Sequence, residues 1–411
     1  MYAEDDLRLE SFELPAITQD EILVEVVTDS LCMSSWKEAK QGKAHKRVPL
    51  WLDTTPIIIG HEFCGRILDV GKTWAHQFRA GDQVAVQPAL NIPGSMDTIG
   101  YSYPYVGGNA TYVVIPNIVM QMGCLLPYAG EGFFYGSLAE PMSCIIGAFH
   151  AMYHTQSGVY QHEMGLRQGG NLLLMASAGP MGLGAIDYAL HAERKPRRIV
   201  VTDIDAVRLK RAESLYSPQD AAQIGIELHY VNTSLPDSEA YLWTISEDQG
   251  YDDVMVFAPI PSVIEHADRM LAYDGCINFF AGPTDHNLSA KVNFYNVHYN
   301  AAHIMGTTGG NTQDMREALD MMSTQQINPA SMITHIGGLN CALEATLHLP
   351  EIPGGKKLIY PHIDLELTAL EDLQQLGESD PVMAHLACIV QDKGGLWSVE
   401  AERYLLEALA P

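Results

Sequence analysis

The sequence has few positive charges, with 24 Lys and Arg against 50 Asp and Glu and a formal net charge of −26 over 411 residues. A protein that binds nucleic acid needs a basic surface for the phosphates, so this balance argues against such a partner. No apolar run reaches the roughly 18 residues that a membrane-spanning helix requires, so we expect no membrane association. The first residues, MYAEDDLRLE, are acidic where a secretory signal peptide is basic, so we expect no such signal.

Cysteines are few and scattered. The chain has seven, an odd number, and none of them form a CxxC pair. A disulfide framework is therefore not expected in so long a chain, and a reducing cytoplasm is the expected compartment. An apolar content of 47% and a charged content of 18% are typical of a globular protein, and the length suggests at least two domains.

Two patterns divide the chain. Up to about residue 120, short apolar segments alternate with Gly-Asp and Gly-Gly turns, which predicts an antiparallel, barrel-like region. Between about 168 and 306, strand-like and helix-like segments alternate, which predicts a doubly wound parallel sheet. The expected strands there are 172–175, 198–203, 253–258, 275–280 and 303–306, with helices around 205–216 and 262–272. Beyond this region we expect a helix at 312–322 and a strand at 356–360. The last fifty residues are expected to be helical and mixed, and they contain no catalytic motif.

The stretch Leu172–Leu190 predicts a strand, a glycine turn and a helix, which together bring backbone N–H groups to a pyrophosphate. The turn departs from the pattern G-x-G-x-x-G because Ser177 replaces the first glycine. Gly179 and Gly182 fill the other two positions, and Ser177 can make the turn if its φ stays negative. Pro180 suits the first helical turn because it has no N–H to leave unsatisfied. Such turns also occur without a nucleotide, so the turn alone is a weak indication.

Asp203 strengthens the prediction. It lies 21 residues after Gly182 at the end of the next expected strand, where a carboxylate can accept hydrogen bonds from the adenosine ribose. This favours NAD over NADP, although the nearby Arg208 can accommodate a 2′-phosphate. The predicted cofactor-binding residues are Ser177, Gly179, Pro180, Met181, Gly182, Asp203 and Arg208.

Four residues could form a zinc site. Cys32, His61 and Glu62 fall at expected turns in the first domain, and Glu140 lies at the domain junction. Thiolate, imidazole and carboxylate all ligate zinc, and three protein ligands with one open position make a catalytic site. Taken singly, a histidine beside an acid is more often a surface pair, and a cysteine before methionine is more often part of a core.

A basic stretch follows Cys32. Five of the chain's Lys and Arg lie within residues 37–47, against one acid. The stretch is either a solvated loop or a site that attracts a phosphorylated substrate through Lys43, Lys46 and Arg47.

Together these motifs resemble the zinc-dependent medium-chain dehydrogenases/reductases of the alcohol dehydrogenase superfamily, over residues 20 to 360. Within that superfamily the chain is similar to the sorbitol and polyol dehydrogenases and to the L-sorbose 1-phosphate reductases. The motifs that carry the resemblance are Cys32-Met33-Ser34, Gly60-His61-Glu62, Gly81-Asp82-Gln83-Val84, Glu140-Pro141, the Ser177–Gly182 turn and Asp203.

The resemblance implies a GroES-like catalytic domain from residues 1–145 and 307–411, and a Rossmann cofactor domain from 146–306. It implies that Cys32, His61 and Glu140 ligate one catalytic zinc, with Cys144 as a rival to Glu140. Glu62 would ligate directly or exchange with water, and Ser34 would lie in the proton path.

Two departures from the family's pattern matter. Residues 85–123 contain no cysteine, so no second, structural zinc is expected. Lys37 replaces the histidine that often continues the proton relay, so the proton would leave through Ser34 to solvent or ribose.

The implied reaction is hydride transfer between NAD(P)H and a ketose or polyol in a dry cleft, with zinc lowering the pKa of the alcohol. The expected substrate is a sugar phosphate such as L-sorbose 1-phosphate or glucitol 6-phosphate. The alternatives are a free polyol dehydrogenase and a zinc-free nucleotide-binding relative. The family also implies a homo-oligomer, a dimer or tetramer.

Overall fold

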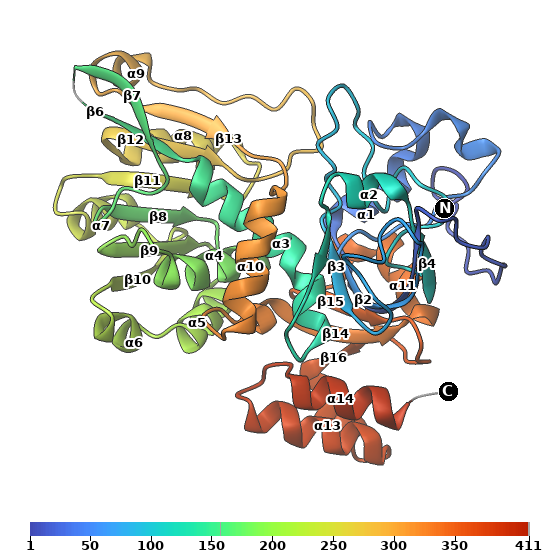
Figure 1. Ribbon diagram of the computed structural model, residues 1–411. Helices are drawn as coiled ribbons and strands as arrows, with labels where there is room; N and C mark the ends of the chain where they lie inside the picture. The colour runs from blue at the N-terminus through green and yellow to red at the C-terminus, as the bar shows by residue number, and fades with distance from the viewer. Residues whose placement is uncertain (157, 410–411) are drawn as a thin grey trace. The chain divides into compact units, whose positions relative to one another are not determined.

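The computed structural model describes residues 1–156 and 158–409, and the chain divides into two compact units (Figure 1). The first comprises residues 1–143, 311–325 and 333–411, and the second comprises 144–310 and 326–332. Helix α3, Phe133–Ala151, contains the boundary between Ser143 and Cys144. Among the described residues, no helix has both the length and the apolar content needed to cross a bilayer.

The first unit is built on an eight-stranded sheet with the order β16-β14-β15-β1-β2-β3-β5, to which β4 adds by pairing with β1. Its pairs are antiparallel except β14 with β15, which run parallel. The strands are β1 Ile22–Ser30, β2 Phe63–Val70, β3 Gln83–Val86, β4 Tyr112–Ile115, β5 Leu125–Pro127, β14 Ile333–Gly338, β15 Lys356–Tyr360 and β16 Thr368–Ala369.

Apolar side chains alternate along the first half of β1, which explains why this strand lies in the middle of the sheet. Ile22, Val24 and Val26 point into a core that Phe63 and Ile67 of β2 complete, since residues two apart on a strand share a face. The helices of this unit are α1 Met33–Gln41, η1 Gly42–Ala44, η2 Leu50–Asp53, α2 Asn117–Gln121, α10 Thr312–Ser323, α11 Leu339–Leu347, η4 Leu349–Glu351, η5 Leu370–Asp372, α12 Leu373–Leu376, α13 Pro381–Asp392 and α14 Val399–Ala408.

The second unit contains a six-stranded, wholly parallel sheet with the order β10-β9-β8-β11-β12-β13. This is the doubly wound order in which a dinucleotide binds at the carboxyl ends of the central strands. The elements are β8 Asn171–Met175, α4 Pro180–His191, β9 Arg198–Asp203, α5 Ala206–Leu215, α6 Pro218–Gln223, β10 Glu227–Asn232, α7 Ser238–Ile245, β11 Tyr251–Val256, α8 Pro261–Met270, β12 Leu271–Phe279, α9 Phe294–Tyr299, β13 His303–Gly306 and η3 Pro329–Met332. A separate hairpin pairs β6, Tyr153–Gln156, with β7, Val159–Met164.

The predicted fold class, a GroES-like domain with a Rossmann domain, is confirmed. Strand β9 has the expected bounds, whereas β12 begins four residues before the expected 275. The pairing of β11 with β12 is irregular there, and Asp274 has a φ of 58°. Hairpin β6–β7 and strand β10 were not predicted. Every residue of β7 is exposed, so it carries no apolar alternation.

Candidate metal centre and dinucleotide-binding turn

A possible metal centre lies in the first unit. The ligand atoms of Cys32, His61 and Glu62 lie within 4.8 Å of one another, on side chains that are partly or fully buried. Cys32 is the N-cap of α1, where its Sγ accepts the backbone N–H of Ser34 at 3.4 Å. A helix N-terminus favours a thiolate. Soft sulfur, imidazole and carboxylate together are a donor set that suits zinc.

The imidazole of His61 is held by a residue that the sequence did not single out. Oγ of Ser35 lies 3.2 Å from Nδ1 of His61, which leaves Nε2 as the ring nitrogen for a metal. Burial is the main cause that lowers the pKa of His61, to about 4, so the ring is neutral as a metal ligand requires. Ser35 lies one position after Ser34, the serine predicted for proton transfer.

Glu62 is held by two further unpredicted residues. Nζ of Lys356, on β15, lies 2.5 Å from both carboxylate oxygens of Glu62. Oγ of Ser30 also donates to Glu62. Burial raises the pKa of Glu62, but the charges of Lys356 and His61 and these hydrogen bonds more than offset it, so that the pKa is lowered. Glu62 is therefore ionised, and its charge is balanced by Lys356.

Close backbone packing supports this arrangement. The carboxylate of Asp29 accepts the backbone N–H of Glu62 at 3.2 Å. Gly60 has a φ of 95°, and a Cβ there would lie 2.7 Å from Asp29 Oδ2. A Cβ at Gly108 would lie 2.1 Å from Asp29 Oδ1. Glycine at both positions lets the loops close around Asp29 and place His61 and Glu62.

Glu140 lies in α3 and is 8% exposed, but it is outside the three-residue cluster. Its charge still acts on Cys32. Burial first, and then the charges of Glu62 and Glu140, raise the pKa of the Cys32 thiol to about 12. The thiol therefore needs a cation to ionise at neutral pH, as a zinc ligand does. Cys144 follows Glu140 one helical turn later and is half-buried.

The three cations predicted to bind a substrate phosphate lie in different environments. Lys43 is exposed and pairs with Asp53, and Lys46 is exposed. Arg47 is partly buried, and its guanidinium carbon lies 5.4 Å from the centre of the Tyr101 ring. That ring lies 5.0 Å from the ring of His61. Of the three cations, Arg47 is thus the one that the structure connects to the metal cluster. Burial lowers the pKa of Lys37, and the opposite influence of the Cys32 charge is smaller, so the pKa is lowered.

The dinucleotide turn lies in the second unit, between β8 and α4. Ser177 keeps a negative φ, and the left-handed residue is Ala176, with a φ of 55°. A Cβ at Gly182 would lie 1.7 Å from the carbonyl oxygen of Ser177, so this glycine permits the packing of helix on strand. A Cβ at Gly179 would meet nothing within 4 Å. Open space at Gly179 is what the approach of a pyrophosphate needs.

Asp203 ends β9 beside this turn. Its carboxylate accepts the N–H of Ala178 at 3.1 Å and also those of Ile204 and Asp205. Three of about four acceptor positions are thus occupied, and one remains for a ribose hydroxyl. Arg208, in the first turn of α5, is exposed, and its Nε lies 3.6 Å from Oδ2 of Asp205. Pro180 opens α4, and Met181 follows it.

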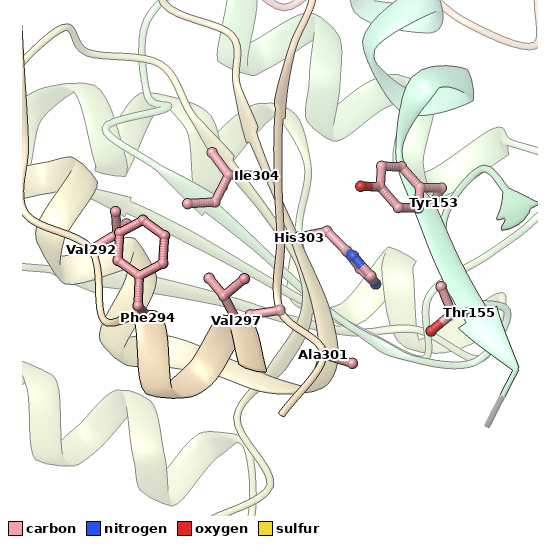
Figure 2. A pocket seen from close by; sticks show the side chains of 9 residues that line it. Tyr153, Thr155, Val292, Phe294, Val297, Ala301, His303 and Ile304 are labelled. Carbon is pink, nitrogen blue, oxygen red and sulfur yellow. The ribbon is translucent and has the colours of Figure 1, made fainter. Parts of the chain in front are cut away.

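A hollow of about 550 Å³ lies elsewhere in the second unit, along β13 and α9 (Figure 2). The predicted site residues do not line it. The rings of Tyr153 and His303 are 4.5 Å apart on one side, and Phe294 and Val297 lie on the other. The remaining lining residues are Thr155, Val292, Ala301, Ala302 and Ile304.

Comparisons with known proteins identify the family of this chain. A family model of the alcohol dehydrogenase GroES-like domain matches residues 18–123, and one of the zinc-binding dehydrogenases matches 180–324. The chain is 53% identical to mannitol-1-phosphate 5-dehydrogenase of Aliivibrio fischeri, over 98% of this chain and 96% of that protein. It is 50% identical to L-sorbose 1-phosphate reductase of Klebsiella pneumoniae, over 99% and 96%.

Among solved structures, 2R,3R-butanediol dehydrogenase from Bacillus subtilis has the same fold, with a TM-score of 0.71 at 20% identity. The match covers 87% of this chain and 97% of that one. The family implies a zinc ion and a nicotinamide cofactor. On the family matches and the two full-length relatives, the chain belongs to the zinc-binding dehydrogenases.

Proposed function

We propose that the protein is a zinc-dependent reductase that transfers hydride between a nicotinamide cofactor and a ketose or polyol phosphate, such as L-sorbose 1-phosphate or glucitol 6-phosphate. The observation that carries the substrate class is the contact series Arg47, Tyr101, His61. In this series the Tyr101 ring contacts both the metal-cluster residue His61 and the guanidinium of Arg47. Guanidinium binds phosphate with paired, charge-assisted hydrogen bonds. The names of the two full-length relatives, both of sugar-phosphate enzymes, support the same class.

We assign one zinc per chain to Cys32, His61 and Glu140, with Glu62 as a direct or exchanging ligand. A zinc ion there supplies a Lewis acid that lowers the pKa of a bound hydroxyl and polarises a carbonyl. Ser35 keeps His61 oriented, and Lys356 keeps Glu62 ionised and in place. Ser34, in the first turn of α1, passes the hydroxyl proton toward solvent.

We assign the cofactor to the turn Ser177–Gly182, with the pyrophosphate at the N-terminus of α4. The remaining acceptor position of Asp203 suits a ribose 2′-hydroxyl and repels a 2′-phosphate, so NAD(H) is preferred to NADP(H). Arg208 is the residue that would bind a 2′-phosphate. Titration with NADH and NADPH tests the preference: Arg208→Ala lowers only the NADPH affinity.

A substrate panel tests the phosphate. L-sorbose 1-phosphate and glucitol 6-phosphate are compared with L-sorbose and glucitol, each with NADH/NAD and NADPH/NADP. We expect a kcat/KM at least 100-fold higher for the phosphorylated compounds. Arg47→Ala removes most of this difference and mainly raises KM, whereas Lys43→Ala and Lys46→Ala have smaller effects. Equal activity on free and phosphorylated substrates, unchanged in all three variants, would show a free polyol dehydrogenase instead.

Metal analysis of the purified chain separates the proposal from a zinc-free, nucleotide-binding relative. We expect about one zinc per chain and loss of activity with a chelator. Zinc far below one per chain, with activity that a chelator does not change, would contradict the zinc assignment. The zinc content does not depend on which substrate the enzyme prefers, so this test is independent of the substrate panel.

We propose that two copies associate along the open edge of the parallel sheet. Among the described residues β13 is the last strand of that sheet, and exposed apolar side chains of α9 line a hollow together with it. Phe294 is 73% exposed, and Tyr299 is 62% exposed. Edge strands with apolar neighbours are sites of pairing. Light scattering of the protein and of Phe294→Asp tests this: the variant shifts toward the monomer, and equal masses would oppose the proposal.

A further inference from the structure

The C-terminal helices reach the start of α3 through one buried carboxylate. α13 and α14, the paired helices at the red end of the chain in Figure 1, belong to the first unit. Glu402 of α14 is 2% exposed. Its two oxygens accept the backbone N–H groups of Phe133 at 2.7 Å and Phe134 at 2.9 Å. Glu402 therefore caps α3 from 269 residues away.

This cap replaces one that the local sequence lacks. The first N–H groups of a helix have no partner within it, and a Ser, Thr, Asp or Asn usually accepts them. Gly132 precedes Phe133 here, and glycine has no side chain that could accept a hydrogen bond. Tyr360 also donates to Glu402 at 3.0 Å, and Nε1 of Trp397 donates to the Tyr360 hydroxyl at 2.8 Å. Glu402 is thus fixed by both the helix that it caps and the sheet strand β15.

The capped helix carries Glu140. A Cβ at Gly136 would lie 2.3 Å from Sγ of Cys64, so α3 lies directly against β2 at that point. Cys64 follows His61 and Glu62 closely in sequence. Glu140 lies one turn beyond Gly136, about 6 Å along the helix and on the same face. Pro141 removes one internal hydrogen bond beside Glu140, so the helix is weakened at that turn.

We infer that Glu402 is a positioning residue for the zinc site: by capping α3 it sets the position of Glu140 relative to Cys32 and His61. The inference assigns a function to the C-terminal segment, in which the sequence shows no catalytic motif. It rests on the proposed zinc ligation by Glu140. Losing the cap lets the first turn of α3 fray and shift, and the shift reaches Glu140 through the close contact at Gly136.

The test uses the full chain, freed of metal and reloaded with Zn²⁺ or Co²⁺. Zinc affinity is measured by competition with a chelator, and ligand geometry by the visible absorption bands of the Co²⁺ protein. We expect Glu402→Ala to bind zinc at least 10-fold more weakly and to change the Co²⁺ spectrum. Glu402→Gln keeps one amide oxygen, which can accept one of the two N–H groups, and restores part of both. Glu407→Gln, an exposed change on the same helix, matches the wild type.

The outcomes separate the two proposals. Failure of the wild type to bind zinc would refute the proposed metal site. Wild-type zinc binding, with affinity within twofold and an unchanged Co²⁺ spectrum in Glu402→Ala, would refute the positioning function alone. If Glu402→Ala does not fold, Tyr360→Phe serves in its place, because it removes one of the three donors. We expect a smaller change of the same sign from it, and an unchanged spectrum there would also count against the inference.

Discussion

Nζ of Lys356 lies 2.5 Å from each carboxylate oxygen of Glu62, and the two side chains are 7% and 1% exposed. The residues are 294 positions apart in sequence. Lys356 opens β15, which pairs with β1, and β1 pairs with β2 just after Glu62. The ion pair therefore joins β15, late in the sequence of the first unit, to the metal cluster near its start.

Removing one partner of this pair leaves a buried charge alone. We expect Lys356→Met to lower the free energy of unfolding by about 3–5 kcal/mol, measured by urea denaturation. The double variant Glu62→Gln/Lys356→Met regains much of this, because neither charge remains. Lys72→Met, an exposed lysine, is the control and changes stability by less than about 0.5 kcal/mol. If Lys356→Met is as stable as the control, the pair is not the stabilising contact that the geometry indicates.

The adjacent serines of α1 provide a matched pair. Ser35 holds Nδ1 of His61, whereas the backbone N–H of Ser34 faces Cys32. We expect Ser35→Ala to weaken zinc binding by about 10- to 100-fold, the usual loss when a partner of a metal-bound histidine is removed. Ser34→Ala leaves zinc affinity unchanged and lowers kcat. Chelator competition and steady-state kinetics measure the two effects, and equal zinc loss in both variants would contradict the division of functions.

Local patterns explain what the sequence predicted. Strand β9 and Asp203 at its end follow from an apolar run that stops at an acid, and the helix at 312–322 follows from its Asn311 cap. The residues around Glu62 could not be predicted in this way. Lys356 is part of a strand whose five residues, two of them lysines, are all buried. Nothing in that run marks Lys356 rather than Lys357 as the partner of an acid 294 positions earlier.

Glu402 shows the same limit. A glutamate in an amphipathic helix is normally on the solvent face, and its helix carries three other charged residues that are exposed: Glu400, Arg403 and Glu407. Only the distance to Phe133 and Phe134 shows that Glu402 is a cap. A missing local cap before α3, at Gly132, was the available signal in the sequence. The missing cap indicates that the helix needs an acceptor from elsewhere, but it does not indicate which residue provides it.

Two glycines of the dinucleotide turn separate folding from binding. A Cβ at Gly179 enters open space, so Gly179→Ala keeps the wild-type melting temperature but lowers NADH affinity by at least 10-fold. A Cβ at Gly182 would lie 1.7 Å from a carbonyl oxygen, so Gly182→Ala lowers the melting temperature. Thermal unfolding and NADH fluorescence titration measure both. Unchanged NADH affinity in Gly179→Ala would place the pyrophosphate elsewhere.

Glu402 makes the free energy of unfolding depend on pH, and one substitution isolates this contribution. Burial raises the pKa of Glu402 to about 7, although the two N–H groups and Tyr360 act in the opposite direction. An exposed glutamate in the unfolded chain titrates near 4.3. As the pH rises from about 4.5 to 7, the unfolded chain therefore loses this proton before the folded one, and the folded state becomes relatively less stable. The effect is complete above pH 7 and amounts to about 3 kcal/mol.

The other titratable groups near Glu402 do not interfere in this range. Burial raises the pKa values of Cys64, Tyr128 and Tyr360, so all three stay protonated below pH 8. We expect the free energy of unfolding of the wild type, minus that of Glu402→Gln, to fall by about 3 kcal/mol between pH 4.5 and 8. Urea denaturation of both proteins across this range measures it. Parallel pH profiles for the two proteins would show that Glu402 titrates in the folded chain as it does in water.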